Sequence, residues 1–485
     1  MASTSAIERT NIIGLTSDSR RIEAGFLFAA LPGSRHDGRA FIVDAIRRGA
    51  AAVLAPPGTR LPEVSDRQGR PAPVLITDDN PRRRFALMAA RFFARQPATV
   101  AAVTGTNGKT SVVTFLRQIW SMLGLRAASM GTLGISAPDI VPEIDVSGSL
   151  TTPDPVDLHR ALAQLADADV RYLALEASSH GLEQNRLDGV RITAAAFTNL
   201  SRDHLDYHQS MDAYFAAKRR LMAEILAEGG TAVLNADVAE FAPLAEAISG
   251  RDVRIMTFGW HGGDIRLDAV EALTHGQRLT ISIGSRVHQI IVPLVGTFQA
   301  TNALCAVALA IATGADSAAA VMSLASLEGV RGRVQRAGQR RNGAAVYVDY
   351  AHTPDALRAV LTALRPHVGN RLAVVFGCGG DRDRGKRREM GRIAAALADE
   401  VIVTDDNPRG EDPAAIRRQI LEGCPQAREI GDRREAITGA VAALAAGDLL
   451  VVAGKGHETG QIIGGAVIAF DDVEAVHAAI AEADG

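Results

Sequence analysis

The sequence is poor in the features that mark secreted or membrane-bound proteins. Its 485 residues include only 3 cysteines, Cys305, Cys378 and Cys424, which lie far apart and form no Cys-x-x-Cys pair. Neither a disulfide framework nor a zinc site is therefore expected, and a reducing compartment fits best. No apolar run is long enough to span a bilayer, and the N-terminal region lacks a basic start followed by an apolar core. We expect a cytoplasmic protein with no membrane insertion.

Net charge and aromatic residues are also scarce. The chain has 52 Lys and Arg against 55 Asp and Glu, a formal net charge of -3, and 4% aromatic residues. Basic and aromatic residues do not cluster together, so no nucleic-acid partner is expected. Small anionic substrates are compatible with this balance, and we expect small-molecule partners and a monomer.

Apolar residues, by contrast, make up 47% of the chain, which is enough for several cores. We predict an α/β protein of three domains. They are a small α/β domain (1–97), a parallel-sheet domain resembling a P-loop ATPase (98–335) and a Rossmann-like doubly wound domain (336–485). Helices are predicted over 211–227, 300–315, 386–398, 413–422 and 433–446, and the alanine-rich helix 300–315 should be buried core. The basic, glycine-containing stretch 335–344 is expected to end the second unit.

The stretch "TVAAVTGTNGKTSVVTF", residues 99–115, resembles a phosphate-binding loop but is shorter, because Val103 stands where the usual loop has a glycine. A buried strand leads into Gly105-Thr106-Asn107-Gly108-Lys109-Thr110, where backbone N–H groups can face an anion before a helix begins. Lys109 can reach terminal phosphates and Thr110 can ligate Mg²⁺. The alternative is a plain glycine-asparagine turn leading into a helix.

Three apolar strands of the last domain each end in a polar loop: "FGCGGDRD", "TDDNPRGED" and "AGKGHETG". In a doubly wound sheet such loops share one edge, where ligands bind. A dinucleotide fingerprint is disfavoured in the first loop because Arg382 stands where a small residue is needed.

The hexapeptide "TDDNPR" occurs twice, at 77–82 and at 404–409. In the first copy Asn80 and Pro81 lead straight into a helix, which indicates a structural N-cap. In the second copy Glu411, Asp412 and Pro413 can supply the cap. We therefore expect the second copy to be the functional one.

These stretches occur together with "TTPD" (151–154), "EASSHGLEQNR" (176–186), "SRDHLDYH" (201–208), "YFAAKRRL" (214–221) and "DYAHTPDAL" (349–357). The set resembles the Mur ligases over essentially the whole chain, and within that family the ligases that add meso-diaminopimelate to UDP-N-acetylmuramoyl-L-alanyl-D-glutamate. The resemblance implies an ADP-forming amide ligase of peptidoglycan precursor synthesis that works through an acyl phosphate. It also implies that the first domain holds uridine, the second ATP and the third the amino acid.

The resemblance assigns roles to individual residues. For ATP they are Gly105, Thr106, Asn107, Gly108, Lys109, Thr110, Ser111, Asn302 and Arg333, with Asp349 and His352 facing the nucleotide. For the muramyl-peptide substrate they are Ser19, His36, Thr151, Thr152, Ser178, Gln184 and Arg186. For meso-diaminopimelate they are Arg382, Asp406, Asn407, Pro408, Arg409, Gly454 and Glu458.

For Mg²⁺ the implied ligands are Thr110, Glu176, His204 and Lys218, and Lys218 is carbamylated by CO₂ in the family. Lys109, Lys218 and His204 are the implied catalytic residues. The spacing of Lys218 beside Arg219 and Arg220 alone predicts a solvated basic helix face. His204 alone would be read as a structural histidine.

The chain departs from the family pattern at Leu150 and Gln299, where asparagine is usual, and at Arg331, where proline is usual. Three other functions compete: a lysine-adding ligase of the same family, a folylpolyglutamate-type ligase, and a nucleotide-dependent switch that forms no amide. The "DDNPR" loop and a full uridine domain argue against the two ligases. The polar loops at the sheet edge of the last domain argue against the switch, because a switch would not need this additional ligand-binding edge.

Overall fold

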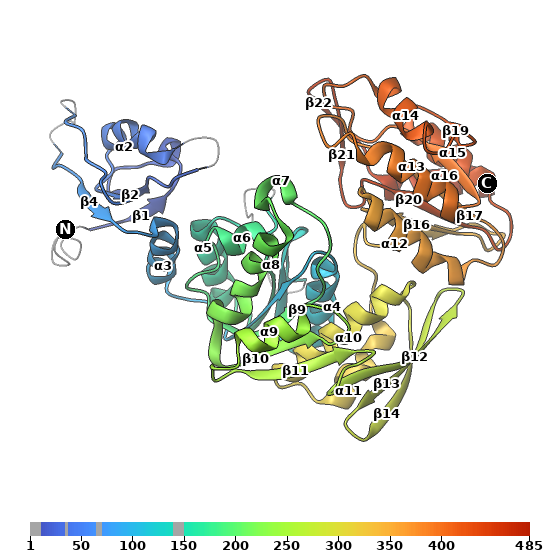
Figure 1. Cartoon of the computed structure of the whole chain (residues 1–485), viewed down its shortest axis with the longest axis horizontal. Coiled ribbons are helices and arrows are strands. Elements are labelled where there is room, and N and C mark those ends of the chain that lie inside the picture. The colour runs from blue at the N-terminus through green and yellow to red at the C-terminus, as the bar shows by residue number, and fades with distance from the viewer. Residues whose placement is uncertain (1–10, 34–36, 65–69, 139–149) are drawn as a thin grey trace. The chain divides into compact units, whose positions relative to one another are not determined.

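The structure is a computed structural model that describes residues 11–33, 37–64, 70–138 and 150–485. Its contacts divide the chain into two compact units, Met1–Lys109 with Gly124–Met256, and Thr110–Leu123 with Thr257–Gly485. Figure 1 traces the chain from its blue N-terminal end to its red C-terminal end. Strands and helices alternate in both units.

The first unit opens with a parallel sheet in the order β1-β2-β3-β4. Its elements are β1 (Gly14–Thr16), β2 (Phe26–Ala29), α2 (Ile42–Arg48), β3 (Ala52–Ala55), β4 (Val74–Thr77) and α3 (Pro81–Phe93). The Asn80 side chain accepts a 3.0 Å hydrogen bond from the Arg83 N–H, and Pro81 begins α3. The first "TDDNPR" copy is thus a helix cap, as predicted.

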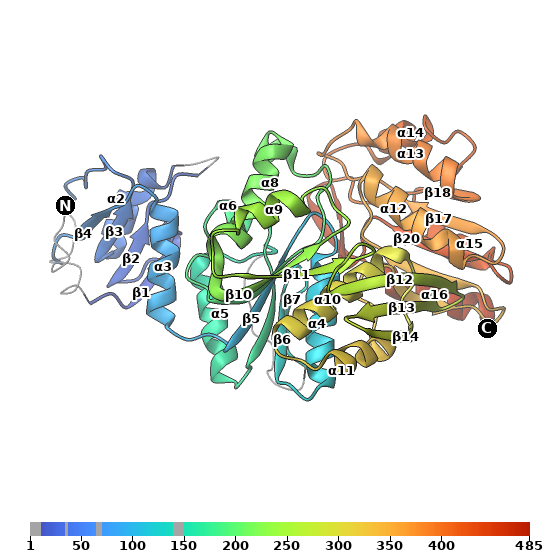
Figure 2. The same ribbon diagram turned by 60° about the horizontal axis from the view of Figure 1, so that its bottom comes forward.

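A larger sheet follows in the same unit, in the order β10-β9-β5-β8-β6-β7, and it is parallel except for β7. Its strands are β5 (Thr99–Thr104), β6 (Ala127–Gly131), β7 (Gly134–Ser136), β8 (Tyr172–Glu176), β9 (Ile192–Phe197) and β10 (Leu226–Asn235). The accompanying helices are α5 (Pro155–Asp167), α6 (Ser179–Glu183), α7 (Leu205–His208), α8 (Met211–Arg220) and α9 (Phe241–Ala247). Because β5 lies between β8 and β9, the loop after it starts in the interior of the sheet (Figure 2).

The helix predicted over 211–227 is shorter than expected. α8 ends at Arg220, a π-helical turn covers Leu221–Ile225, and β10 begins at Leu226. Leucine, alanine and glutamate in this stretch favour a helix, but Leu226 pairs with Ile192 of β9. Pairing within a buried sheet overrides the local helix propensity.

β11 (Arg254–Gly259) begins in the first unit and ends in the second, and β12 (Ile265–Leu273), β13 (Gly276–Ile283) and β14 (Arg286–Val292) belong to the second; their order is β14-β13-β12-β11. The helices of this region are α4 (Lys109–Met122), which starts at the phosphate-type loop, α10 (Thr297–Ala312) and α11 (Ser317–Met322). Residues 303–310 of α10 are fully buried, so the prediction of a core helix is confirmed. In the part of the chain that the structure describes, every helix falls short of the length and apolar character that a membrane crossing requires.

The C-terminal sheet has the order β15-β16-β20-β17-β18-β19, and all of its strands except β15 run parallel. Its strands are β15 (Gln335–Gln339), β16 (Ala345–Asp349), β17 (Leu372–Phe376), β18 (Glu400–Val403), β19 (Arg428–Glu429) and β20 (Leu449–Ala453), and the hairpin β21 (Gly460–Ile463) and β22 (Ala466–Ala469) stands apart. The stretch 335–344 therefore begins with a strand of this sheet, where the sequence suggested only the end of the preceding unit.

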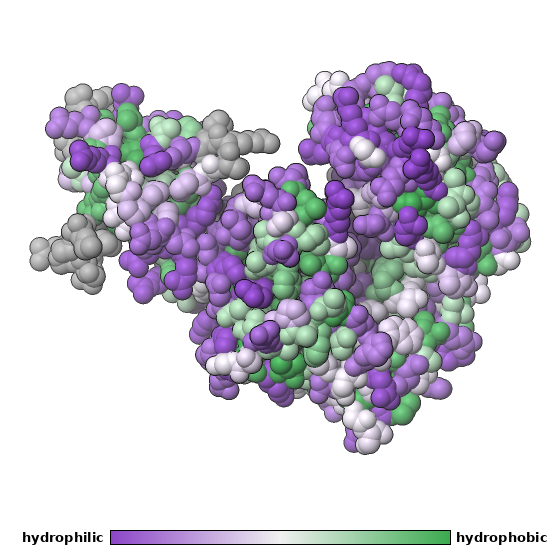
Figure 3. Space-filling model, viewed as in Figure 1, coloured by the Kyte–Doolittle hydropathy of each residue, from purple (hydrophilic) through white to green (hydrophobic). Residues whose placement is uncertain are grey.

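Helices cover both faces of the C-terminal sheet, as a doubly wound fold requires. Apolar residues of α12 (Pro354–Leu364), α13 (Lys386–Leu397) and α14 (Pro413–Leu421) pack in one core cluster, and those of α15 (Arg433–Ala442) and α16 (Asp472–Asp484) pack in another. The surface over α13 and α14 is largely hydrophilic in Figure 3. This is expected for helices that pack one face against a sheet and expose the other to solvent. Loops after β16, β17, β18 and β20 thus leave the same edge.

Candidate active site

The loop between β5 and α4 turns at two glycines. Gly105 and Gly108 have φ values of +143° and +88°, which L side chains rarely adopt. A Cβ at Gly105 would also overlap the hydroxyl of Thr198. The Lys109 Nζ donates to the carbonyl oxygens of Gly105 at 2.9 Å and Thr106 at 2.8 Å. A plain glycine-asparagine turn, the alternative interpretation of this loop, would not require Lys109 to fold back over the loop.

Lys218 lies beneath the same loop and is 1% exposed. Its Nζ donates to the Gly105 carbonyl oxygen at 2.7 Å and lies 4.3 Å from the centre of the Tyr214 ring. Burial, and secondarily the charge of Lys109, hold the pKa of Lys218 well below its ordinary value. The solvated-face interpretation of the spacing is therefore wrong for Lys218, whereas its neighbour Arg219 is exposed.

The residues expected to bind Mg²⁺ have different surroundings. Glu176 is 1% exposed and pairs in register with Val103 of β5. Its Oε1 accepts from the Thr132 N–H at 2.9 Å and its Oε2 from the Thr132 hydroxyl at 3.2 Å. Thr110 and Ser111 are buried in the first turn of α4.

His204 is exposed, with its Nε2 3.5 Å from Asp203 Oδ2, and its ring lies 4.8 Å from that of His180. Among the residues described, no group of three or more His, Cys, Asp and Glu side chains is placed to hold a metal ion. The expected set differs from such a group, because it combines one carboxylate and one imidazole with a hydroxyl and a modified lysine.

Five of the seven positions expected to contact the muramyl-peptide substrate belong to one hydrogen-bonded network. Thr152 Oγ1 donates to the Glu176 carbonyl and accepts from the backbone N–H and the hydroxyl of Ser178, each at 3.0 Å. Arg186 donates to the Thr152 carbonyl and to the Gln184 side chain, both at 2.7 Å. The Thr151 hydroxyl lies 3.1 Å from that of Thr132, which also contacts Glu176.

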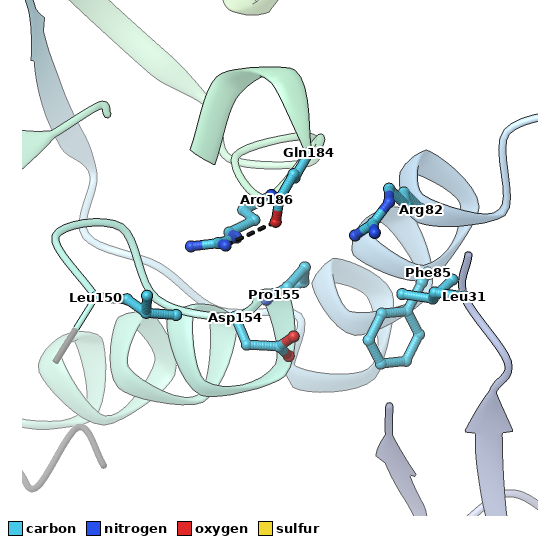
Figure 4. A pocket seen from close by; sticks show the side chains of 8 residues that line it. All are labelled: Leu31, Arg82, Phe85, Leu150, Asp154, Pro155, Gln184 and Arg186. Carbon is cyan, nitrogen blue, oxygen red and sulfur yellow. Dashed lines mark hydrogen bonds between the residues drawn. The ribbon is translucent and has the colours of Figure 1, made fainter. Parts of the chain in front are cut away.

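This network borders a pocket (Figure 4) whose lining comes from the N-terminal region and from the segment around α5 and α6. The lining residues are Leu31, Arg82, Phe85, Leu150, Asp154, Pro155, Gln184 and Arg186. Leu150, the first departure from the family pattern, is 49% exposed at this pocket. Ser19 is buried in a short 3-10 turn outside the lining, and His36 lies outside the described residues.

The second "TDDNPR" copy and the "GKGHE" loop meet in the second unit. The Asn407 side chain donates to Glu458 Oε2 at 2.8 Å. Arg409 Nη1 donates to the Gly380 carbonyl at 2.9 Å, and the Gly380 N–H donates to the Asn407 carbonyl at 2.9 Å. The three polar loops are therefore joined, as their position at one sheet edge predicted.

Other expected residues of this region differ in burial. Asp406 is 8% exposed and Pro408 is buried, whereas Arg382 is exposed. Gly454 has φ +115°, and a Cβ there would approach Asp406 Oδ2 to 2.6 Å. Glycine at position 454 therefore allows its loop to contact the loop that carries Asp406.

Sequence reasoning missed Lys455, which is 0% exposed. Its Nζ donates to Asn407 Oδ1 at 3.1 Å and to Glu458 Oε2 at 2.9 Å. A lysine between two glycines directly after a buried strand is the signal that could have found it. Lys455 neutralises Glu458 and fixes the orientation of the Asn407 amide.

The adenine-side positions also form a linked set. Asn302 donates to the Gln299 side chain, and Gln299 donates to the Arg333 carbonyl, both at 3.1 Å. Gln299, the second departure from the family pattern, thus links these two residues. Asp349 accepts from the N–H groups of Val334 and Ala351 at 2.7 Å, and burial raises its pKa to about 6.

The remaining predicted positions are simpler. Arg331, the third departure, forms an ion pair with Asp471 at 2.6 Å. His352 Nδ1 donates to the Tyr350 carbonyl oxygen at 2.9 Å. Neither contact involves the residues around Arg409.

Models of known protein families match most of the chain. Three family models match in order: "Mur ligase family, catalytic domain" over residues 11–92, "Mur ligase middle domain" over 103–310, and "Mur ligase, glutamate ligase domain" over 332–456. They confirm the predicted three-domain α/β fold.

Two relatives carry the name UDP-N-acetylmuramoyl-L-alanyl-D-glutamate--2,6-diaminopimelate ligase. The protein of Caulobacter vibrioides is 53% identical and covers 95% of this chain and 94% of its own length. The protein of Chelativorans sp. is 52% identical and covers 98% of this chain and 95% of its own length. A solved structure with the same name is 36% identical, with a TM-score of 0.71 over 97% of this chain and 95% of its own. This chain therefore belongs to the Mur ligase family.

Proposed function

We propose that this chain is an ATP-dependent, ADP-forming ligase that joins meso-diaminopimelate to UDP-N-acetylmuramoyl-L-alanyl-D-glutamate. We assign the uridine nucleotide to residues 1–97, ATP to 98–335 and the amino acid to 336–485. Full-length relatives with about half of their residues identical carry this activity in their names. The observation that carries the amino-acid assignment is the contact of Arg409, Asn407 and Glu458 at one sheet edge.

An amide cannot form directly from a carboxylate at neutral pH, because oxide is a poor leaving group. Transfer of the γ-phosphoryl group of ATP to a carboxylate oxygen of the substrate gives an acyl phosphate and ADP. The amine of the amino acid then attacks the acyl carbon, the C–O bond to phosphate breaks, and phosphate and a proton are released. We assign Lys109 to the charge of the transferred phosphoryl group, since its Nζ lies over the loop.

We propose that a magnesium ion binds near the loop. The Glu176 carboxylate and Thr110 hydroxyl supply the oxygen ligands that Mg²⁺ prefers, with His204 as a further candidate. When bound, Mg²⁺ neutralises phosphate charge. An ammonium group cannot bind a cation, so Lys218 fits this set only after modification.

A lowered pKa makes Lys218 suitable for that modification. The neutral amine can attack CO₂ to form an N–C bond, and loss of a proton leaves an anionic carbamate. Support for this proposal comes from the burial of Lys218 and from the lowering of its pKa by burial and by Lys109.

Selection of meso-diaminopimelate over lysine requires recognition of one additional carboxylate at the far end of the side chain. We propose that the planar donors of Arg409 bind this carboxylate and that Glu458 accepts the distal ammonium group. With lysine bound, Arg409 would lack that partner in a desolvated site, which can produce discrimination of about 10⁴-fold or more.

The test compares kcat/KM for meso-diaminopimelate and for lysine, with product mass as the readout. We expect the wild type to prefer meso-diaminopimelate strongly, and Arg409→Ala to lose this preference mainly through KM for the amino acid. Arg392→Ala, at an exposed position of α13, serves as the matched control. Efficient use of lysine by the wild type, or phosphate release without a new amide, would contradict the proposal.

A further inference from the structure

The first "TDDNPR" copy does more than begin a helix, because its last residue lines a pocket. Asn80 caps α3 and Pro81 starts it, which places Arg82 in the first turn. Figure 4 shows the Arg82 side chain directed toward Gln184 and Arg186, which lie in the segment after α6. The lining therefore contains two guanidinium groups from distant parts of the chain.

Positive charge exceeds negative charge in this lining. Burial lowers the pKa of Arg186, and the charge of Arg82 lowers it further, against the opposing effect of Asp154. Asp154 is the carboxylate of the lining, and burial raises its pKa, so its negative charge is disfavoured. An anionic ligand would relieve the repulsion between the two guanidinium groups.

Arg82 has the donors for such a ligand. Its Nη2 donates to the Pro32 carbonyl at 2.5 Å, which fixes one end of the guanidinium group. A guanidinium group carries five N–H donors in a plane, so one backbone contact leaves several for a ligand. Arg186 is held in turn by the Thr152 carbonyl and the Gln184 side chain. The planar donors of a guanidinium group match the geometry of a phosphate or carboxylate.

We propose that Arg82 joins Arg186, to which the family resemblance already assigns the muramyl-peptide substrate, in binding an oxyanion of that substrate in the pocket of Figure 4. This inference rests on the proposed function, whose substrate carries both a diphosphate and carboxylates. Arg82 is thereby a binding residue contributed by the N-terminal domain.

Equilibrium binding without ATP or amino acid tests the proposal. The probes are UDP-N-acetylmuramoyl-L-alanyl-D-glutamate and UDP-N-acetylglucosamine, which keeps the diphosphate but lacks the peptide. The variants are Arg82→Ala, Arg82→Gln and, as the matched control on the same helix, Arg91→Ala at an exposed position. Loss of a charged hydrogen bond predicts about a 10- to 100-fold weaker Kd for the full substrate in Arg82→Ala.

The two probes distinguish the sources of the oxyanion. Equal losses for both would identify the diphosphate, and a loss confined to the full substrate would identify a peptide carboxylate. Unchanged affinity in both Arg82 variants, or an equal loss in Arg91→Ala, would overturn the proposal. A thermal melt of each variant without ligand shows whether it is folded. If Arg82→Ala is not folded, the comparison is made with Arg82→Gln. Because binding is measured without turnover, a wild type that binds the substrate but forms no amide would contradict only the proposed function.

Discussion

Lys109 and Lys218 donate to a single acceptor, the carbonyl oxygen of Gly105, at 2.9 and 2.7 Å. Burial disfavours the charged form of Lys218, and repulsion from the nearby ammonium group of Lys109 disfavours it further. Lys109 therefore has two roles in our proposal. It stabilises phosphate charge, and it helps to keep Lys218 reactive toward CO₂.

Substitution of Lys218 tests the carbamate. We expect Lys218→Ala to lose activity and short carboxylic acids to restore part of it, because they return an anion to the same space. Arg219→Ala, at the exposed neighbouring position, should retain activity. Full wild-type activity in CO₂-depleted buffer, with no added mass on the Lys218 peptide, would exclude the modification.

Substitution of Lys109 tests the phosphate contact. Lys109→Ala should lower kcat by about 10²- to 10³-fold, since it removes an electrostatic contact made to the transferred phosphoryl group. The measurement is ADP release at saturating substrates, with binding of the muramyl substrate as a check on folding. Near-normal turnover would show that the loop serves another purpose.

Individual residues also show where sequence reasoning stops. Asn80 could be identified as a cap because capping depends on neighbours along the chain. Lys218 could not be placed from spacing, because its burial depends on the loop after β5, more than 100 residues away. Contacts between distant segments decide burial, and only the family resemblance pointed to them.

At the scale of elements, the hairpin of β21 and β22 supports the loop that carries Arg409. The Gln461 side chain donates to the Asp406 carbonyl at 2.7 Å, and the Ile462 N–H donates to Asn407 Oδ1 at 2.9 Å. The Arg409 N–H donates in turn to the Ile462 carbonyl at 2.9 Å. Arg409 has φ +53°, an unusual value for a non-glycine residue, and these bonds hold it there.

Gln461 is therefore expected to be a positioning residue for the amino-acid site. Gln461→Leu leaves the Asp406 carbonyl without this donor, at a cost of about 1 kcal/mol, or about fivefold in affinity. We expect KM for meso-diaminopimelate to rise while KM for ATP stays unchanged. Gln289→Leu, at an exposed position of β14, is the matched control. Equal effects of both variants on both KM values would refute a positioning role.

Helices and strands lie where the sequence predicted them when the apolar periodicity and the turn residues agree with the burial in the structure. The three helices predicted for the last domain, and the three strands that precede its polar loops, lie where they were predicted, although α15 ends at Ala442, earlier than expected. The boundary between α8 and β10 could not be predicted, because leucine, alanine and glutamate favour a helix there and the pairing partner Ile192 is distant in sequence. Local helix propensity does not predict the secondary structure where pairing with a distant strand of the sheet determines it.

At the scale of the whole molecule, buried and half-buried histidines link stability to pH in both units. Burial lowers the pKa of His159 and of His180 in the first unit, and of His457 in the second, each from 6.5 to about 4. Between these values the unfolded chain binds more protons than the folded one, so folding stability falls as pH decreases from about 6.5 to 4. Asp349 in the second unit acts in the opposite direction, because burial raises its pKa to about 6 and the folded state then gains a proton first.

The first unit should consequently lose more stability than the second between pH 7 and pH 5. His159 contributes most clearly, since it is 3% exposed, and the slope for one fully shielded group is at most about 1.4 kcal/mol per pH unit. The chain has 2 tryptophans, Trp120 and Trp260, and both belong to the second unit. Melting followed by tryptophan fluorescence should therefore shift less with pH than melting followed by circular dichroism. We expect His159→Gln to flatten the circular-dichroism shift and His477→Gln, at an exposed position of α16, to leave it unchanged. An undiminished shift in His159→Gln would mean that other groups carry the acid sensitivity.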